Sequence, residues 1–291
     1  MEDFSPEELE WLLDVASGFK KEKLDHRPWK DKSVALIFFK SSTRTRVSFE
    51  TAVVHLGGHP IFLNSRDIQF GRGETIEDTG RALSKYVDGI VIRTFAHSDV
   101  TTLAQLFPGP VINGLTDFNH PCQIMADLLT IQEEFGSLKK TVLAYVGDGN
   151  NVANSLVSAA KLGLEVRVAS PEGYEVKPEV RKSAPANVHF TRDPLEAVAG
   201  ADVVYTDTFV SMGEEAEAEI RHRALGPYQV NETLMARAAK KAIFLHCLPA
   251  HRGEEVSAEV IDGSRSRIWP QAENRLHVQK AILATLAHHE D

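Results

Sequence analysis

Short apolar runs alternate with amphipathic segments along the whole chain, and this alternation limits the fold more than any other feature. The runs are apolar throughout, as in strands buried on both faces of a sheet, and the segments between them carry apolar residues at helical spacing. Strands that alternate with helices predict an α/β protein built on parallel sheets. Strands are expected near residues 34–39, 61–63, 89–93, 111–113, 141–146, 164–169, 187–191, 202–206 and 242–246. Helices are expected from Pro6, from 119 and near 47–56, 75–86, 151–162, 178–182, 195–198, 231–239 and 272–289.

A polar stretch at residues 133–140 divides this pattern into two halves. A chain of 291 residues is long enough for about two domains with separate cores. We therefore expect two doubly wound domains, each with a parallel sheet covered by helices on both faces. The first would comprise residues 1–135, joined by the C-terminal helix 272–289, and the second residues 136–271.

The composition is that of an ordinary soluble protein, with 43% hydrophobic and 25% charged residues. A net charge of −9 argues against nucleic acid or an acidic membrane as the main partner, because both require a basic surface. The chain begins Met1-Glu2-Asp3, unlike a signal peptide, and no apolar run approaches the ~20 residues of a membrane span. We therefore expect a cytoplasmic protein whose local basic clusters bind a small anion.

Residues 41–46, with the sequence SSTRTR, lie where an expected strand meets an expected helix. Free N–H groups and the positive end of the helix dipole face an anion at such a turn, and an arginine adds a planar fork that fits phosphate. The stretch therefore predicts an anion cradle, with phosphate the favoured ligand. Arg44 is assigned to the anion and Arg46 to a structural role, because residues two apart on a helix do not face one spot. A plain helix cap with solvated arginines is the competing interpretation.

Functional groups in doubly wound sheets gather beyond the carboxyl ends of the strands. Arg93 directly follows one expected strand, although an arginine there is more often a surface residue. His120, Gln123 and Asp127 share one helix face, and the first two lie near the positive end of that helix. They are placed to polarise a bound carbonyl; the alternative is that His120 only caps or packs.

The turn at residues 146–151, with the sequence VGDGNN, suggests a dinucleotide-binding loop. The motif is incomplete, because Val152 stands where the third glycine of G-x-G-x-x-G belongs and no acid ends the next strand. What remains is a tight turn that presents amides. Asp207, after the strand near 202–206, opens a loop that either binds a ligand or is a mobile acidic surface loop.

The two cysteines, Cys122 and Cys247, are too few for a disulfide framework. With no spaced set of ligands, zinc is not expected either. His246 precedes Cys247, but neighbouring strand residues point to opposite faces, so His246 is poorly placed to activate the thiol as a nucleophile. A buried, inert cysteine is the commoner case.

Five segments taken together and in order resemble the aspartate/ornithine carbamoyltransferase family, and the resemblance covers essentially the whole chain. The first two are shared by transcarbamoylases generally. The Ser-Met-Gly and His-Cys-Leu-Pro segments are typical of the ornithine-specific members, rather than those that use aspartate or putrescine. The segments are STRTR at 42–46, HPCQ at 120–123, Asp207 with SMG at 211–213, HCLP at 246–249 and AENR at 272–275.

The resemblance implies an enzyme of arginine biosynthesis that makes citrulline and phosphate from carbamoyl phosphate and ornithine, without a metal or organic cofactor. It also implies a homotrimer with sites near subunit boundaries. The implied catalytic residues are Arg93, His120 and Cys247. Carbamoyl phosphate would be bound by Ser42, Thr43, Arg44, Thr45, Gln69, Arg93, His120, Gln123, Cys247, Leu248 and Arg275. Ornithine would be bound by Asn151, Asp207, Ser211 and Met212.

Three alternatives stay open at this point. A carbamoyltransferase with another amine acceptor, such as putrescine or an N-acylated ornithine, must explain Asp207 and Ser211, which suit a free α-ammonium group. A non-catalytic anion-binding protein on the same scaffold would be expected to have lost a residue such as Arg44, Arg93 or His120, and all are present. A nicotinamide-dependent dehydrogenase is weakened by the missing third glycine.

Overall fold

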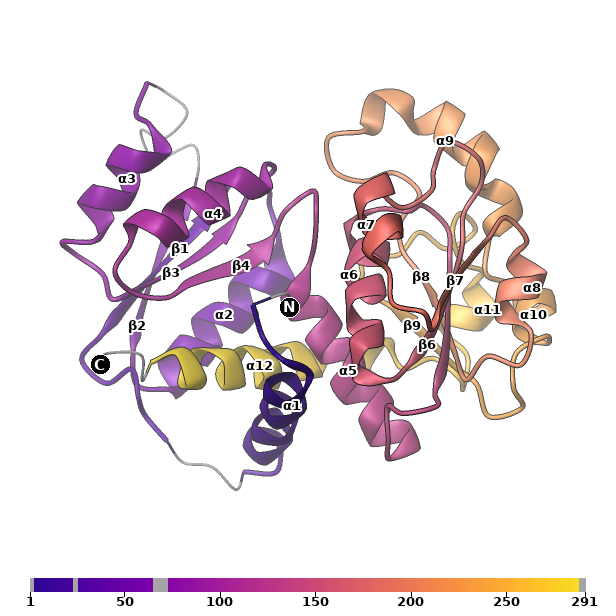
Figure 1. Ribbon diagram of the computed structural model, residues 1–291, viewed down its shortest axis with the longest axis horizontal. Coiled ribbons are helices and arrows are strands. Elements are labelled where there is room, and N and C mark those ends of the chain that lie inside the picture. The colour runs from indigo at the N-terminus through magenta and orange to yellow at the C-terminus, as the bar shows by residue number, and fades with distance from the viewer. Residues whose placement is uncertain (1–2, 23–25, 65–72, 288–291) are drawn as a thin grey trace. The chain divides into compact units, whose positions relative to one another are not determined.

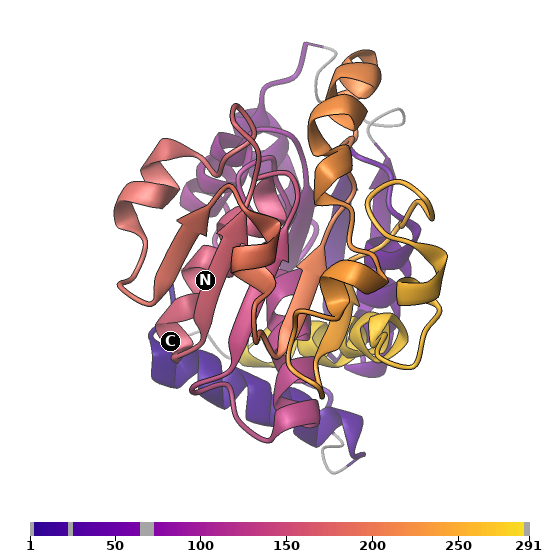
Figure 2. The same cartoon turned by 90° about the vertical axis from the view of Figure 1, so that its right-hand side faces the viewer.

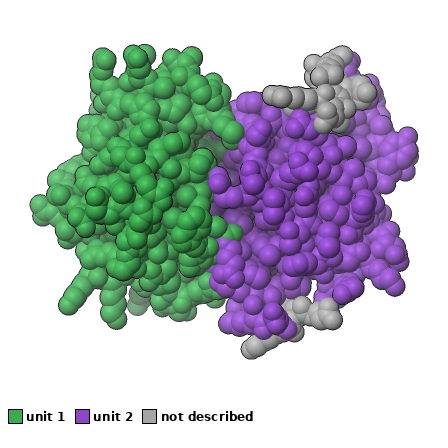
Figure 3. Space-filling model, turned by 180° about the vertical axis from the view of Figure 1, so that it is seen from behind, with its two compact units in different colours: residues 1–9, 127–272 green, residues 10–126, 273–291 purple. Residues whose placement is uncertain are grey.

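The computed structural model describes residues 3–22, 26–64 and 73–287, so Gln69 lies outside the described residues. The chain forms two compact units, coloured separately in Figure 3. Unit 1 comprises residues 1–9 and 127–272, and unit 2 comprises residues 10–126 and 273–291. The chain passes between the units within three helices, α1 (Pro6–Lys20), α5 (Pro121–Phe135) and α12 (Ile268–Leu286). The domain limits expected at residues 135 and 272 stay predictions.

Unit 2 is built on a four-stranded parallel sheet with the strand order β2-β1-β3-β4 (Figure 1). The order reverses between β1 and β3, and ligands of doubly wound sheets bind where the order reverses. Its strands are β1 (Ser33–Phe38), β2 (His59–Asn64), β3 (Gly89–Arg93) and β4 (Val111–Leu115). Its own helices are α2 (Thr43–His55), α3 (Ile76–Leu83) and α4 (His97–Leu106).

Unit 1 is built on a five-stranded parallel sheet with the order β7-β6-β5-β8-β9 (Figures 1 and 2). Here the order reverses between β5 and β8, whose Tyr145 and Tyr205 are direct neighbours. The strands are β5 (Val142–Val146), β6 (Glu165–Ala169), β7 (Val188–Thr191), β8 (Val203–Thr206) and β9 (Ile243–His246). The α-helices are α6 (Asn151–Ala159), α7 (Pro178–Ser183), α8 (Pro194–Val198), α9 (Ala218–Leu225), α10 (Glu232–Met235) and α11 (Ala258–Ile261). Short 3₁₀ turns are η1 (Ala160–Leu162), η2 (Glu215–Glu217) and η3 (Gly226–Tyr228).

The apolar runs form the cores of both units, as expected for strands covered on both faces. All five residues of β3 are buried, and so are all four residues of β8. Helix α12 is fixed within unit 2 by Trp29, a fully buried side chain whose Nε1 donates to the carbonyl of Leu283 at 2.8 Å. Burying one large apolar side chain contributes roughly 1.5–3 kcal/mol, so such anchors hold α12 in a defined position.

The predicted fold class, two parallel sheets flanked by helices, is confirmed. Three helices were not expected from the sequence: α4, α9 and the four-residue α11, whose preceding Ser257 makes no side-chain cap bond. Helix α4 gives a weak signal, because Ala96 before it makes no side-chain cap bond and its buried residues are only Val100 and Leu103. Helix α9 follows an acidic stretch that is typical of a loop. Its signal is weak as well, because its buried residues are Arg221 and Leu225.

Within the described part of the chain, no helix has the length and apolar character needed to cross a membrane.

Candidate functional site

The first candidate site lies where β1 leads into α2. Ser42 precedes the helix in an extended conformation (φ −163°), and its hydroxyl accepts the backbone N–H of Thr45 at 3.2 Å. Thr43 and Arg44 are exposed in the first helical turn, which contains no acidic residue to offset the helix dipole. The turn therefore presents free N–H groups, hydroxyls and a guanidinium to an anion.

Arg46 has a structural role, as expected from its spacing. Its guanidinium lies over the ring of Phe62, 3.5 Å from the ring centre, and its Nε donates to Glu50 at 2.9 Å. Arg44, by contrast, stays exposed at the turn.

Four buried polar side chains of unit 2 add to this edge of the sheet. Arg93 ends β3, the strand next to β1, while His120 and Gln123 lie at the start of α5. Arg275, from α12, donates through Nη1 to Gln123 Oε1 at 2.5 Å and through Nη2 to the hydroxyl of Thr45 at 3.1 Å. Arg93, His120, Gln123 and Arg275 are all nearly inaccessible to solvent. Arg275 thus joins three helices at one point.

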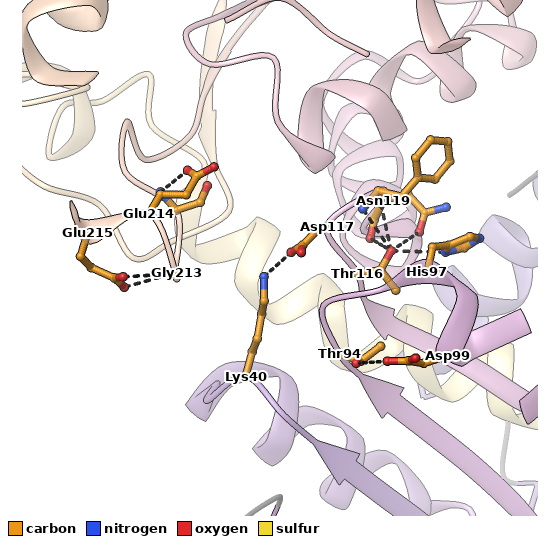
Figure 4. A network of polar contacts seen from close by, with 12 residues as sticks. Lys40, Thr94, His97, Asp99, Thr116, Asp117, Asn119, Gly213, Glu214 and Glu215 are labelled. Carbon is orange, nitrogen blue, oxygen red and sulfur yellow. Dashed lines mark hydrogen bonds and ion pairs between the residues drawn. The ribbon is translucent and has the colours of Figure 1, made fainter. Parts of the chain in front are cut away.

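The position of His120 is set by the turn before it. The Thr116 hydroxyl accepts the backbone N–H of Asn119 at 3.2 Å and contacts His97 Nδ1 at 3.3 Å (Figure 4). The carbonyl of His120 then accepts the N–H of Gln123 at 3.1 Å, which starts the helix. Burial lowers the pKa of His120 well below its ordinary value, and the charges of Arg275 and Arg93 lower it further. The imidazole is therefore neutral at pH 7 and acts as a hydrogen-bonding group beside two cations.

Stability should depend on pH through His120. The unfolded chain protonates this histidine near its ordinary pKa of about 6.5, whereas the buried imidazole stays neutral to lower pH. We expect the free energy of unfolding to fall by up to about 1.4 kcal/mol per pH unit below pH 6.5 from this one proton. His120→Gln should remove that contribution, as measured by urea unfolding between about pH 7 and 5. The exposed His59→Gln is the control, and equal pH slopes in both variants would contradict the assignment.

Lys40 is a buried cation that the sequence analysis missed. It follows β1 and pairs with Asp117 (Figure 4). It also lies over the ring of Phe95, 4.5 Å from the ring centre. No motif marks it, but its position just after a buried strand was a usable signal.

The second candidate site lies at the switch point of unit 1, beyond β5, β8 and β9. Asp207 follows β8 and is nearly buried. Its Oδ2 accepts a hydrogen bond from Asn150 Nδ2 at 2.8 Å, and its Oδ1 accepts one from Cys247 Sγ at 2.9 Å. Residues that follow three different strands therefore converge on one carboxylate, as the topology of the sheet predicts.

Asn150 contacts Asp207, while its neighbour Asn151 is the residue that the resemblance implies as an ornithine ligand, a role that stays a prediction. The Asn150 Oδ1 also accepts the backbone N–H of Val152 at 2.9 Å and so caps α6. Asn151 is half-buried in the first turn of α6. The combination of a strand end and a cap residue is the signal that pointed to Asn150.

The His-Cys-Leu-Pro segment forms the turn after β9. His246 is buried, and its ring nitrogens face Glu255 Oε1 at 3.2 Å and the backbone N–H of Leu248 at 2.9 Å. Its ring is thus committed to holding the turn, which agrees with the expectation that it does not activate Cys247. Leu248 takes a positive φ of 60°, and its N–H bond to His246 helps to hold this uncommon conformation.

The Ser-Met-Gly segment lies in the loop between β8 and η2. Ser211 is half-buried and Met212 is 45% exposed. The Ser211 N–H donates to Glu214 Oε2 at 3.2 Å, and the Gly213 N–H donates to Glu215 Oε1 at 3.0 Å (Figure 4). The acidic residues after the loop therefore bind its own backbone.

Two groups of side chains in the described residues are close enough to hold a metal ion. One is Asp207, His246 and Cys247; the other is His251, Glu254 and Glu255. Hydrogen bonds within each group, such as that from Cys247 to Asp207, account for the short distances without an ion.

The fold and the two candidate sites define a class of doubly wound α/β protein. The switch point of unit 2 carries buried arginines, and the switch point of unit 1 carries an aspartate and a thiol. Two family models match this chain. The carbamoyl-P binding domain of aspartate/ornithine carbamoyltransferase matches residues 1–133, and the Asp/Orn binding domain of the same enzymes matches residues 139–286.

Individual relatives agree with the family models. The ornithine carbamoyltransferase of Anoxybacillus flavithermus is 55% identical, with 98% of this chain and 94% of that protein covered. The anabolic ornithine carbamoyltransferase of Pyrococcus furiosus is 52% identical over the same shares. A solved ornithine carbamoyltransferase structure from Pyrococcus furiosus superposes with a TM-score of 0.95 at 51% identity, covering 99% of this chain and 96% of that one. The chain belongs to the aspartate/ornithine carbamoyltransferase family.

Proposed function

We propose that this enzyme transfers the carbamoyl group of carbamoyl phosphate to the δ-amine of L-ornithine, giving L-citrulline and phosphate in arginine biosynthesis. The observation that carries the proposal is the buried group formed by Arg93, Arg275 and the neutral His120. Two fixed cations and a neutral hydrogen-bonding imidazole suit an acyl phosphate whose carbonyl oxygen gains negative charge during attack. The names of the relatives, one of them anabolic, support ornithine and the biosynthetic direction.

Unit 2 binds carbamoyl phosphate in this proposal. The phosphate lies at the start of α2, where the helix dipole and the Arg44 fork bind it. Arg93, His120 and Gln123 hold and polarise the carbamoyl carbonyl, and Arg275 contacts the same molecule. Cys247 and the Leu248 carbonyl of unit 1 complete its contacts. The phosphate ligands are Ser42, Thr43, Arg44 and Thr45.

Unit 1 binds ornithine through its amino-acid end. Asp207 accepts the α-ammonium group, because it is a buried carboxylate whose oxygens already accept hydrogen bonds from Asn150 and Cys247. Asn151, Ser211 and the backbone of Met212 bind the rest of the α-amino acid group.

The reaction is an acyl transfer. The neutral δ-amine attacks the carbamoyl carbon, negative charge builds on the carbonyl oxygen beside Arg93 and His120, and the tetrahedral intermediate collapses with phosphate leaving. The δ-ammonium group resembles that of lysine, with a pKa of ~10.4, so deprotonating it at pH 7 costs roughly 4–5 kcal/mol. We assign Cys247 the task of orienting this amine or assisting its deprotonation, without a covalent intermediate.

Cys247→Ala should lower kcat for citrulline formation about 10²-fold, the lower end of the range for a positioned proton-transfer group. The measurement is a steady-state pH profile between about pH 6 and 10. Cys122→Ala is the matched control: burial raises the pKa of Cys122 to about 11, so that thiol is inert and its loss should leave kcat within about twofold. Near-full turnover by Cys247→Ala across the alkaline limb would contradict the role of Cys247.

The acceptor is tested directly. Carbamoyl transfer is measured as phosphate release from carbamoyl phosphate with ornithine, and in parallel with putrescine, N-acetylornithine and aspartate. Turnover with ornithine alone is expected. Preference for another amine would overturn the roles of Asp207 and Ser211 but would leave the proposed phosphate site intact. No turnover with any of the four acceptors would overturn the proposed enzyme function.

The proposed enzyme is a cytoplasmic homotrimer. The trimer follows from the family resemblance and the cytoplasm from the sequence patterns described above, and Gln69 is proposed to contribute to carbamoyl phosphate binding. Light scattering should give a mass three times that of the 32.2 kDa chain, or a multiple of that trimer. A monomeric mass would contradict the assembly.

A further inference from the structure

Arg221 of α9 is a buried arginine with no part in the chemistry above. Only 8% of its surface is exposed. Its Nη1 donates to Asp148 Oδ2 at 3.0 Å, and its Nη2 pairs with Glu214 Oε1 at 2.7 Å. A third carboxylate, that of Glu217, lies 3.4 Å from Nε. A guanidinium of fixed planar geometry that is held by several acids defines the relative positions of the segments that carry them.

The contacts of Arg221 include both ends of the loop at residues 210–213. Nη1 lies 3.4 Å from the carbonyl of Phe209, directly before the loop, and Glu214 is directly after it. Glu214 has two functions, because its Oε1 pairs with Arg221 while its Oε2 accepts the backbone N–H of Ser211 at 3.2 Å. One carboxylate therefore connects the loop backbone to the buried guanidinium.

On its other side, Arg221 holds the turn between β5 and α6. Asp148 lies in that turn, and Asn150, two residues later, donates to Asp207. Burial raises the pKa of Asp148 to about 7, while Arg221 lowers it, so the ionised form of Asp148 depends on Arg221. Glu214 and Asp207 also face this carboxyl and raise its pKa. Loop, turn and Asp207 thus belong to one polar network within unit 1.

We propose that Arg221 and Glu214 are positioning residues for ornithine binding. Together with Asp148 they form the Arg221 clamp, which holds the backbone of residues 211–213 in place relative to the turn at Asp148. The clamp pre-arranges Ser211 and Met212, so that less of the entropy of the loop is lost when the amino acid binds. This inference rests on the proposed function of the same site.

The test compares two glutamates that both pair with Arg221. Glu214→Ala removes the link to the Ser211 N–H, whereas Glu217→Ala removes only a charge beside the guanidinium. We expect Glu214→Ala to raise KM for ornithine about tenfold, as for the loss of one charge-assisted hydrogen bond, with kcat and KM for carbamoyl phosphate within about twofold. Glu217→Ala should leave all three constants within about twofold. Equal KM values for ornithine in the two variants would overturn the clamp and leave the proposed function intact.

A second measurement does not depend on activity. Hydrogen exchange of the peptide that covers residues 209–217 is followed in the free protein. Exchange should be several-fold faster in Glu214→Ala than in Glu217→Ala or the unaltered protein, because the Ser211 N–H loses its acceptor. Unchanged exchange in Glu214→Ala would overturn the clamp, whatever the activity of the enzyme. Failure of the unaltered enzyme to use ornithine would overturn the proposed function, and the exchange measurement would still test the clamp. Glu214 is preferred over Arg221 as the test, because removing Arg221 leaves Asp148 buried without its partner and can unfold unit 1.

Discussion

Arg93→Leu should lower kcat/KM for carbamoyl phosphate by about 10³-fold, the loss expected when one preorganised donor to a developing oxyanion is removed. Arg93 is buried at the end of β3, where leucine fills much of the same volume without a charge. The loss should appear mainly in kcat, because the carbonyl oxygen carries its full negative charge only in the transition state. Steady-state kinetics at saturating ornithine measure it.

The control for this prediction is Arg81→Leu. Arg81 lies on α3 with an exposed side chain, and its contact is an ion pair with Asp78 at 3.4 Å. An exposed pair of this kind contributes little, so kcat/KM should stay within about twofold. If Arg93→Leu folds and retains activity within about tenfold of the unaltered enzyme, Arg93 does not stabilise the oxyanion.

Asp207→Asn should lower kcat/KM for ornithine by roughly 10²–10³-fold, because a buried ammonium group would lose its only proposed countercharge. The substitution keeps the size of the side chain and one carbonyl oxygen to accept from Asn150. Because Asp207 belongs to unit 1, the affinity for carbamoyl phosphate alone should stay within about twofold in a calorimetric titration.

The matched control is Asp262→Asn. That aspartate is exposed and paired with Arg252 at 2.7 Å, so its loss should leave both substrates' constants unchanged. A second comparison uses putrescine as an inhibitor, because it lacks the α-amino acid group. If Asp207→Asn weakens the binding of ornithine and of putrescine equally, Asp207 does not recognise the α-ammonium group.

The site itself was predictable in part. Residues 41–46 predict a helix start that carries hydroxyls and arginines, and the structure places α2 there; anion binding by this turn stays a prediction. The separate roles of Arg44 and Arg46 follow from helical spacing alone, and the contacts of Arg46 with Phe62 and Glu50 agree. Such inferences succeed where the contacts that matter lie within a few residues.

Other parts depend on contacts between distant residues. Arg275 reaches the Thr45 hydroxyl from 230 positions away, and only the packing of α12 in unit 2 makes that contact possible. In the same way, Asn150 contacts Asp207 across 57 positions, and the acidic stretch after Gly213 includes a helix held by Arg221. For Arg275 and Arg221 no local pattern reveals the distant partner, whereas for Asn150 the strand end and the cap position were a usable signal.

Two parallel α/β sheets could be predicted from the order of residues alone, and so could the turns at which we propose that these sheets bind ligands. The reason is that continuous apolar runs, helical periodicity and cap residues express short-range preferences that survive in almost any context. Three features depend on the folded structure: the strand order that makes β1 and β3 neighbours, the burial that keeps His120 neutral, and the convergence of Asn150 and Cys247 on Asp207. Those features arise from burial and from contacts between distant segments. Such interactions contribute free energy only after the chain has folded and both partners are in place.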